Sequence, residues 1–243
     1  MDIRMSAPLT SIDTVWHVGT LELSDRTRQE SLEGVLLSVS QHPEEWGHIA
    51  RCGGNTWELR REGAQWLDAL ALSDAEIADI EDWATRSGFA ERGDLWRVWH
   101  FDEESDDWGY FEFADEQSAL NELDPDMEDE DIPSESGEQL DRLSGLLLTA
   151  KGQDAVGRWR GATQALDAVI MLWAETCLKP ENPDLMGVWW YEDNNPLSLS
   201  CPRGGAFTDR LGEFSISDEL GREPPQSFRD RHAQTSDLSP DSW

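Results

Sequence analysis

Basic residues are scarce in this chain, and their scarcity excludes several classes of partner. Its 243 residues hold 19 Lys and Arg against 51 Asp and Glu, which gives a formal charge of −32. Only Lys151 and Lys179 are lysines. Proteins that bind nucleic acid or an anionic membrane surface need a basic footprint. We therefore expect no direct nucleic-acid binding and no membrane binding, whereas the charge permits a protein partner with a basic surface.

Cysteines and long apolar runs are also scarce. Cys52, Cys177 and Cys201 are an odd number of cysteines without C-x-x-C spacing, which argues against a disulfide framework or a zinc site. No apolar run approaches the ~18 residues of a membrane-spanning helix. The N-terminus, MDIRMSAPLT, lacks the apolar core of a signal peptide. We expect a soluble, cytoplasmic protein, and the oligomeric state stays open.

Tryptophan, in contrast, is abundant, and it predicts a folded core. The chain has 13 tryptophans, and each can bury ~150–250 Å². Segments rich in β-branched and aromatic residues, or with apolar residues at every second position, are typical of strands. Along the chain they are interspersed irregularly with segments whose apolar residues recur at helical spacing. This predicts an α+β fold with a mixed or antiparallel sheet of about six or seven short strands and packing helices. The expected strands lie near residues 12–18, 34–40, 55–60, 94–101, 108–114, 187–192 and 205–208.

Helices are predicted where apolar residues recur at helical spacing. Ser73-x-x-Glu76 is a capping box that starts one helix, and 162–178 is a strongly apolar helix that Pro180 ends. Further helices are expected at 43–50, 115–123, 140–150 and 208–214. The segments 56–63 and 64–70 are expected to form either a strand pair or a strand and an extended connection.

An acidic stretch separates two parts of the chain. No Lys or Arg occurs from Val98 to Asp141, and residues 102–141 contain 18 acids. Its centre, 124–138, has two prolines and almost no apolar residues, which is typical of a disordered linker or an exposed loop. We expect an N-terminal α+β part at 12–123 and a C-terminal part at 139–214 that completes the same domain. A disordered tail is expected at 215–243.

The carboxylates do not form a recognisable metal motif. Residues 124–135 place acids at several positions of a calcium-binding loop, but the position that requires glycine is Asp129. His42 and His48 lie six residues apart, on different faces of a helix. We expect no metal site.

Two short motifs suggest a small-molecule site. In WHVGT a strand ends in a histidine, a glycine and a hydroxyl, and in LLSVS the side chains of Ser38 and Ser40 share one strand face. These motifs resemble the ADP-ribosyltransferase fold, in which a His-Gly-Thr turn and a serine-bearing strand bind NAD. The resemblance implies that His17 and Thr20 hold the adenosine-side ribose and that Ser38, with Ser40 beside it, holds the nicotinamide ribose.

The resemblance also implies a catalytic carboxylate. Glu192, after the strand GVWWY, is the candidate, with His17 as the second catalytic residue and Asp193 as a rival for the carboxylate. The specific structural expectation is that His17 and Ser38 lie on neighbouring strands and face one pocket. The blocks HVGTL and GVWW also resemble uncharacterised accessory proteins of plasmids and other mobile elements, a resemblance that implies no activity.

Three functions remain open from the sequence. The first is NAD-dependent transfer of ADP-ribose to a macromolecular target, as in a toxin or an anti-defence effector of a mobile element such as a plasmid or phage. The second is a non-enzymatic acidic protein that uses residues 102–141 to occupy a basic protein surface, in the manner of a DNA mimic. The third is a globular interaction protein whose acidic linker has no specific role.

Overall fold

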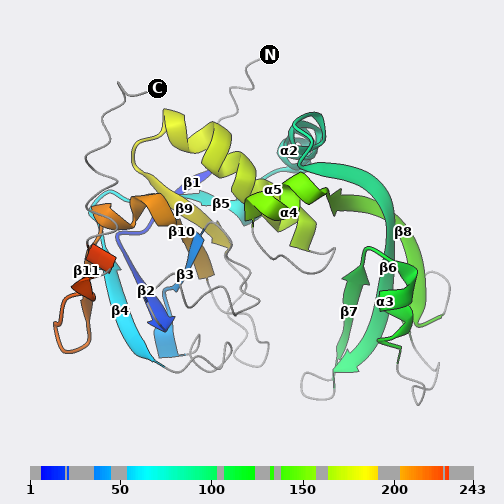
Figure 1. The fold of residues 1–243 in the computed structure, drawn as a ribbon, viewed down its shortest axis with the longest axis horizontal. Helices are drawn as coiled ribbons and strands as arrows, with labels where there is room; N and C mark the ends of the chain where they lie inside the picture. Colours follow the sequence, from blue (N-terminus) through cyan, green and yellow to red (C-terminus); the bar gives the residue numbers. More distant parts are fainter. Residues whose placement is uncertain are drawn as a thin grey trace. The chain divides into compact units, whose positions relative to one another are not determined.

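The chain folds into two sheets with short helices, as a computed structural model shows (Figure 1). Eleven strands lie within the described residues, eight in a mixed sheet and three in an antiparallel sheet, so the predicted α+β class is confirmed. The structure describes residues 7–19, 21, 36–44, 54–102, 107–123, 132–133, 138–156, 164–190, 203–226 and 228–229.

The sheets belong to two compact units. Unit 1 comprises Met1–Ser73 and Ala174–Trp243, and unit 2 comprises Asp74–Trp173. These boundaries differ from the ones expected on either side of 124–138. The physical reason is that the strands before and after the acidic stretch pair within unit 2. In the chain, the acidic stretch therefore begins and ends within unit 2.

Unit 1 contains the eight-stranded sheet. In sheet order its strands are β1 (Leu9–Ser11), β5 (Gln65–Asp68), β9 (Leu185–Trp190), β10 (Arg203–Phe207), β3 (Leu36–Ser40), β2 (Thr14–Gly19), β4 (Asn55–Arg60) and β11 (Ser215–Asp218). Neighbours pair antiparallel except for β5 and β9, which are parallel. Short helical segments accompany the sheet in the described part of unit 1. They include the 3-10 helices η2 (Ala69–Ala71), η4 (Lys179–Glu181) and η5 (Thr208–Glu213), and the π-helical turn η3 (Ala174–Leu178).

The core of unit 1 forms around middle strands that are buried on both faces. All five residues of β3 are buried, and five of the six in β9 are buried. A strand whose residues are nearly all buried is typical of the middle of a sheet that is covered on both faces. Trp66 and Trp189 pack edge to face with ring centroids 5.9 Å apart. Such an aromatic pair contributes about 0.5–1.5 kcal/mol beyond the burial of its area.

Two expectations for unit 1 are corrected. The segments 56–63 and 64–70 do not pair with each other, because β4 pairs with β2 and β11 while β5 pairs with β1 and β9. Residues 215–218, expected in a disordered tail, form β11, and Phe228 is buried in the core. The segment SISD has only one apolar residue, Ile216, which is too few to predict a strand from the sequence.

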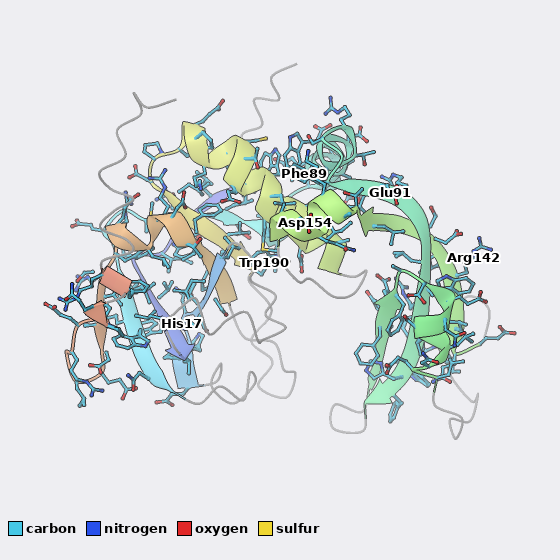
Figure 2. All side chains as sticks on the ribbon, in the orientation of Figure 1. His17, Phe89, Glu91, Arg142, Asp154 and Trp190 are labelled. Atoms are coloured by element: carbon cyan, nitrogen blue, oxygen red, sulfur yellow. The ribbon has the colours of Figure 1, made fainter. Side chains whose placement is uncertain are left out.

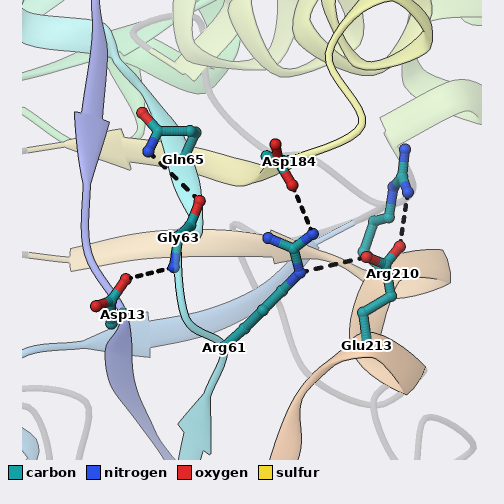
Figure 3. Close-up of polar contacts among 7 residues, drawn as sticks. All are labelled: Asp13, Arg61, Gly63, Gln65, Asp184, Arg210 and Glu213. Atoms are coloured by element: carbon teal, nitrogen blue, oxygen red, sulfur yellow. Dashed lines mark hydrogen bonds and ion pairs between the residues drawn. The ribbon is translucent and has the colours of Figure 1, made fainter.

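Arg61 ties three elements of unit 1 together (Figure 3). It follows β4, and its Nη2 atom donates to Asp184, just before β9, at 2.9 Å. Its Nε atom lies 3.3 Å from Glu213 of η5, whose other oxygen accepts from Arg210. The side chain of Arg61 is 18% exposed, but its partners Asp184 and Glu213 are 64% and 36% exposed, so these ion pairs are open to solvent on the carboxylate side and contribute little individually.

Among its described residues, unit 2 contains the three-stranded sheet and four α-helices. In order the strands are β7 (Asp107–Phe113), β6 (Ala90–Asp102) and β8 (Leu140–Leu148). The helices are α2 (Asp74–Arg86), α3 (Glu116–Leu120), α4 (Ala150–Val156) and α5 (Gln164–Trp173). The start of α2 after Ser73, the hairpin of β6 and β7, and the apolar α5 match the predictions.

Strand β8 corrects a predicted helix at 140–150. Leu140, Leu143 and Leu147 recur at helical spacing, but nine residues of this segment pair in register with β6. Gly145 faces Gly93 across the strands, and a Cβ at Gly145 would lie 2.2 Å from the side chain of Leu95. A glycine inside a helix costs about 1 kcal/mol relative to alanine. Gly145 was therefore a signal against a helix.

Some expectations fall partly or wholly outside the described residues. Of the helix expected at 43–50, Pro43 and Glu44 are described and are helical. Of the acidic segment 124–138, residues 132, 133 and 138 are described, and Ile132 is buried. Among the helices of the described chain, none has the length and apolarity that a membrane crossing requires.

Candidate functional site

His17 lies in the interior of unit 1, on β2 (Figure 2). Its side chain is 6% exposed, and its register partner on β4 is Trp57. The Nδ1 atom of His17 lies 2.8 Å from the backbone carbonyl oxygen of Ser38 on β3. A carbonyl oxygen only accepts, so Nδ1 donates and carries a proton. This hydrogen bond therefore links β2 to β3.

The expectation that His17 and Ser38 face one pocket is wrong. Trp16 is the register partner of Ser40, so these two side chains lie on the same face of the sheet. Ser38 is two residues from Ser40 and shares that face, whereas His17 follows Trp16 and points to the opposite one. The two strands are neighbours, as predicted, but the contact of His17 is with the main chain of Ser38.

Of the other residues expected in a NAD site, only Ser40 belongs to the described part of the chain. The hydroxyl of Ser40 accepts from the backbone N–H of His42 at 2.9 Å and is fully buried. That contact is a local turn interaction. Thr20, Glu192 and Asp193 lie outside the described residues.

A pocket lies on the face of the sheet that carries Trp16. Its volume is about 290 Å³, and it opens over β2, β4 and β11. The residues that line it are Trp16, Pro43, Glu44, Thr56, Glu58, Ser217, Asp218 and Glu219. Register places Trp16, Glu58 and Ser217 side by side across the three strands. Regular strand pairing therefore positions the residues at the base of the pocket. Its volume is near the lower end of the range of ligand pockets in proteins, about 300–1,000 Å³.

One of the four carboxylates around the pocket is committed to the protein. Asp218 is 6% exposed and accepts from the backbone N–H groups of Leu220 and Arg222 and from Arg222 Nε at 2.6 Å. Burial raises the pKa of Asp218, but these hydrogen bonds outweigh burial and hold the pKa below its ordinary value. Asp218 is thus ionised and shapes the turn after β11.

The other three carboxylates are not paired. Glu58 is half-buried on β4, while Glu44 and Glu219 are exposed. Within the described residues, none of the three forms an ion pair or a side-chain hydrogen bond. Carboxylates that share a small space repel one another, so a cation that enters the pocket removes this repulsion.

The pocket is suited chemically to an organic cation. The indole of Trp16 offers a π face, which attracts an ammonium or guanidinium group. Glu58 beside it can accept hydrogen bonds from the same group, and charge-assisted bonds of this kind are about twice as strong as neutral ones. Across the described chain, no group of three or more His, Cys, Asp or Glu side chains is arranged to hold a metal ion.

Sequence reasoning missed Trp16 because it selected the neighbouring residue. The motif WHVGT drew attention to His17, which lies on the core face, whereas the pocket face carries Trp16. The alternation of polar Glu58 with buried Trp57 and Leu59 was a usable signal for an outward face of β4. The sequence offered no sign that β11 would lie beside it.

Comparisons with known proteins identify no relative of this chain. The chain matches no protein-family model, no curated protein and no solved structure.

Proposed function

We propose that this chain is an acidic binding protein that binds a basic protein partner, with a cationic side chain of that partner in the Trp16 pocket. The observation that carries the proposal is the set of unpaired carboxylates, Glu44, Glu58 and Glu219, around the indole of Trp16. Many arginines of the described chain, in contrast, are paired with carboxylates, including Arg61, Arg97 and Arg222. The three glutamates of the pocket, which have no cationic partner among the described residues, can therefore pair with a cation from another molecule.

The charge of the whole chain supports a macromolecular partner. A formal charge of −32 attracts basic surfaces at long range and speeds their association. A desolvated cation–π contact contributes about 2 kcal/mol, and a partly exposed ion pair contributes about 0.2–1 kcal/mol. These energies are too small for tight binding of an isolated side chain, so the pocket positions one residue of a larger interface.

Transfer of ADP-ribose from NAD stays a prediction of the sequence resemblance. It has no support from the pair expected to hold the two riboses, because the side chains of His17 and Ser38 lie on opposite faces of the sheet. Glu192 and Thr20 lie outside the described residues.

The test of the proposed function is calorimetric titration of the full chain with an unstructured arginine-containing peptide. The control ligand is the same peptide with citrulline in place of arginine, which removes the charge and keeps the shape. We expect the arginine peptide to bind more tightly and its affinity to fall with salt. Equal binding of the two peptides would overturn the proposal.

Variants of the protein locate the binding. Trp16→Leu and Glu58→Gln are each expected to weaken the arginine peptide about 3- to 10-fold, which corresponds to about 0.7–1.4 kcal/mol. The matched controls are Trp83→Leu on α2 and Glu91→Gln on β6, where Glu91 is exposed (Figure 2). Equal losses in the pocket variants and the controls would place the binding outside the pocket.

A further inference from the structure

Strand β7 forms one edge of the unit 2 sheet, and α3 contacts it together with its neighbour β6. It pairs with β6 over seven consecutive residues, from Asp107 to Phe113, without a register shift. Its other side has no strand partner within the described chain. Natural proteins protect such an edge with lysine, proline, a bulge or a very short strand. β7 contains no lysine and no proline, and it is seven residues long.

The other edge strands of the two sheets differ from β7. β1 and β11 are short, with three and four residues. β8 is long, but it carries the exposed Arg142 and is contacted by two helices, α4 and α5, whereas among the described helices α3 makes the main contact with β7. Of these edge strands, β7 therefore combines a length of seven residues with backbone N–H and C=O groups on its outer side that have no strand partner in the described chain.

Aromatic side chains on β7 reach solvent on both faces of the strand. Tyr110 is 42% exposed and Phe111 is 52% exposed. Consecutive side chains point to opposite faces, so neither face of the strand is fully covered at this edge. A strand added beside β7 would place its own side chains next to Tyr110 on one face and next to Phe111 on the other, and such pairs stabilise a sheet.

The charge around β7 selects the partner. No Lys or Arg occurs from Val98 to Asp141. The nearest base on the sheet, Arg97, donates to Glu112 at 2.7 Å and lies 4.1 Å from the ring centroid of Tyr110, so it is already engaged. A second copy of this chain brings the same charge of −32 and is repelled, whereas a basic segment is attracted.

We propose that the outer side of β7 binds an extended, basic segment of a partner protein as an additional strand. Main-chain hydrogen bonds would supply affinity, and the neighbouring aromatic and acidic side chains would supply the preference for apolar and basic residues. The proposal rests on the proposed function only for the sign of the partner's charge. It uses unit 2, whereas the Trp16 pocket belongs to unit 1.

The experiment uses the full chain and a short peptide in which arginine and valine alternate. Two further peptides of the same sequence carry N-methyl groups on one or the other alternate set of residues. Alternate N–H groups of a strand point to opposite sides, so only one methylated set faces β7. We expect one methylated peptide to bind about tenfold or more weakly than the other, and amide hydrogen exchange in β7 to slow when the parent peptide binds.

Two variants separate this proposal from the pocket. Tyr110→Ala is expected to weaken the parent peptide and to reduce protection of β7, while Trp16→Leu leaves the protection of β7 unchanged. Equal binding of the two methylated peptides, or protection confined to β1 or β11, would overturn the proposal. Self-association of the free chain through β7 would show that the occupant is a second copy and would overturn it as well.

Discussion

The Nδ1 atom of His17 donates a hydrogen bond to the carbonyl oxygen of Ser38, although the two side chains lie on opposite faces of the sheet. The contact joins a side chain of β2 to the main chain of β3. It predicts that the identity of residue 17 matters to the stability of unit 1 and that the side chain of residue 38 matters much less.

His17→Ala is expected to destabilise unit 1 by about 2–3 kcal/mol, because it leaves a cavity and a buried carbonyl without its donor. Ser38→Ala keeps the carbonyl and is expected to cost less than about 1 kcal/mol. Amide hydrogen exchange of β2 and β3 reports on unit 1 alone and measures both. Equal losses would mean that the Ser38 hydroxyl, and not the carbonyl, is the important group.

For NAD, we expect no cofactor-dependent shift in thermal unfolding and no transfer of label from NAD to proteins of a cell lysate. The physical reason is that the side chains of His17 and Ser38 cannot contact one ligand from opposite faces of a sheet. Label transfer by the natural chain that is lost in Glu192→Ala would contradict this prediction and would establish the transferase function.

The stability of the β11 end is expected to depend on pH through Asp218. Its pKa is lowered from 3.8 in the folded chain, since the hydrogen bonds of Arg222 and Leu220 outweigh its burial. A carboxylate with a lowered pKa stabilises the fold above its unfolded pKa, and this contribution is lost as the pH falls through the folded value. The protection of the β11 amides, measured as their exchange rate relative to an unstructured chain at the same pH, should therefore fall below about pH 4.

Asp218→Asn is the control for that titration. The variant should show faster exchange at neutral pH and a smaller change on acidification, because the ionisable group is absent. A variant with the same acid response as the natural chain would show that another carboxylate is responsible.

Gly187→Ala is expected to disrupt the middle of the unit 1 sheet. A Cβ there would lie 2.0 Å from the carbonyl oxygen of Gly205 and 2.8 Å from the ring of Trp66, and the backbone of β10 cannot move away cheaply. We expect a loss of at least about 3 kcal/mol or failure to fold.

The matched control is Gly63→Ala. Gly63 has φ of 73° and open space around it, so only backbone strain of about 1 kcal/mol is expected. Folded yield and hydrogen exchange of β9 and β10 compare the two variants. Similar behaviour of both would refute the packing explanation.

Much of the fold could be predicted from local patterns. The run LLSVS is apolar enough to require burial on both faces, and it forms the middle strand β3. The helix before Pro180 was visible from its apolar period. Leu140–Leu148 could not be assigned because its leucines fit a helix as well as a strand, and the deciding contacts with β6 lie far away in the sequence.

The candidate pocket could not be predicted because it depends on which strands become neighbours. Trp16 and Glu58 are separated by more than half of unit 1's first segment, and Ser217 comes from the far end of the chain. The sequence alternation tells which residues share a face within a strand, but it does not tell which face meets the core. In β2, the face that carries His17 meets the core and the face that carries Trp16 lines the pocket.

The parallel pairing of β5 with β9 has a consequence for folding kinetics. All of unit 2 lies between these two strands in the chain, so their ladder closes a very long loop. Contacts of such high sequence separation form slowly, because the entropy of loop closure is lost before the contacts stabilise the chain. The pairings inside unit 2 close shorter loops, because β6 and β7 form a hairpin and β6 pairs with β8 within the single segment Asp74–Trp173. We expect it to fold first and to shorten the effective loop, so that the sheet of unit 1 is completed last, when β9 reaches β5.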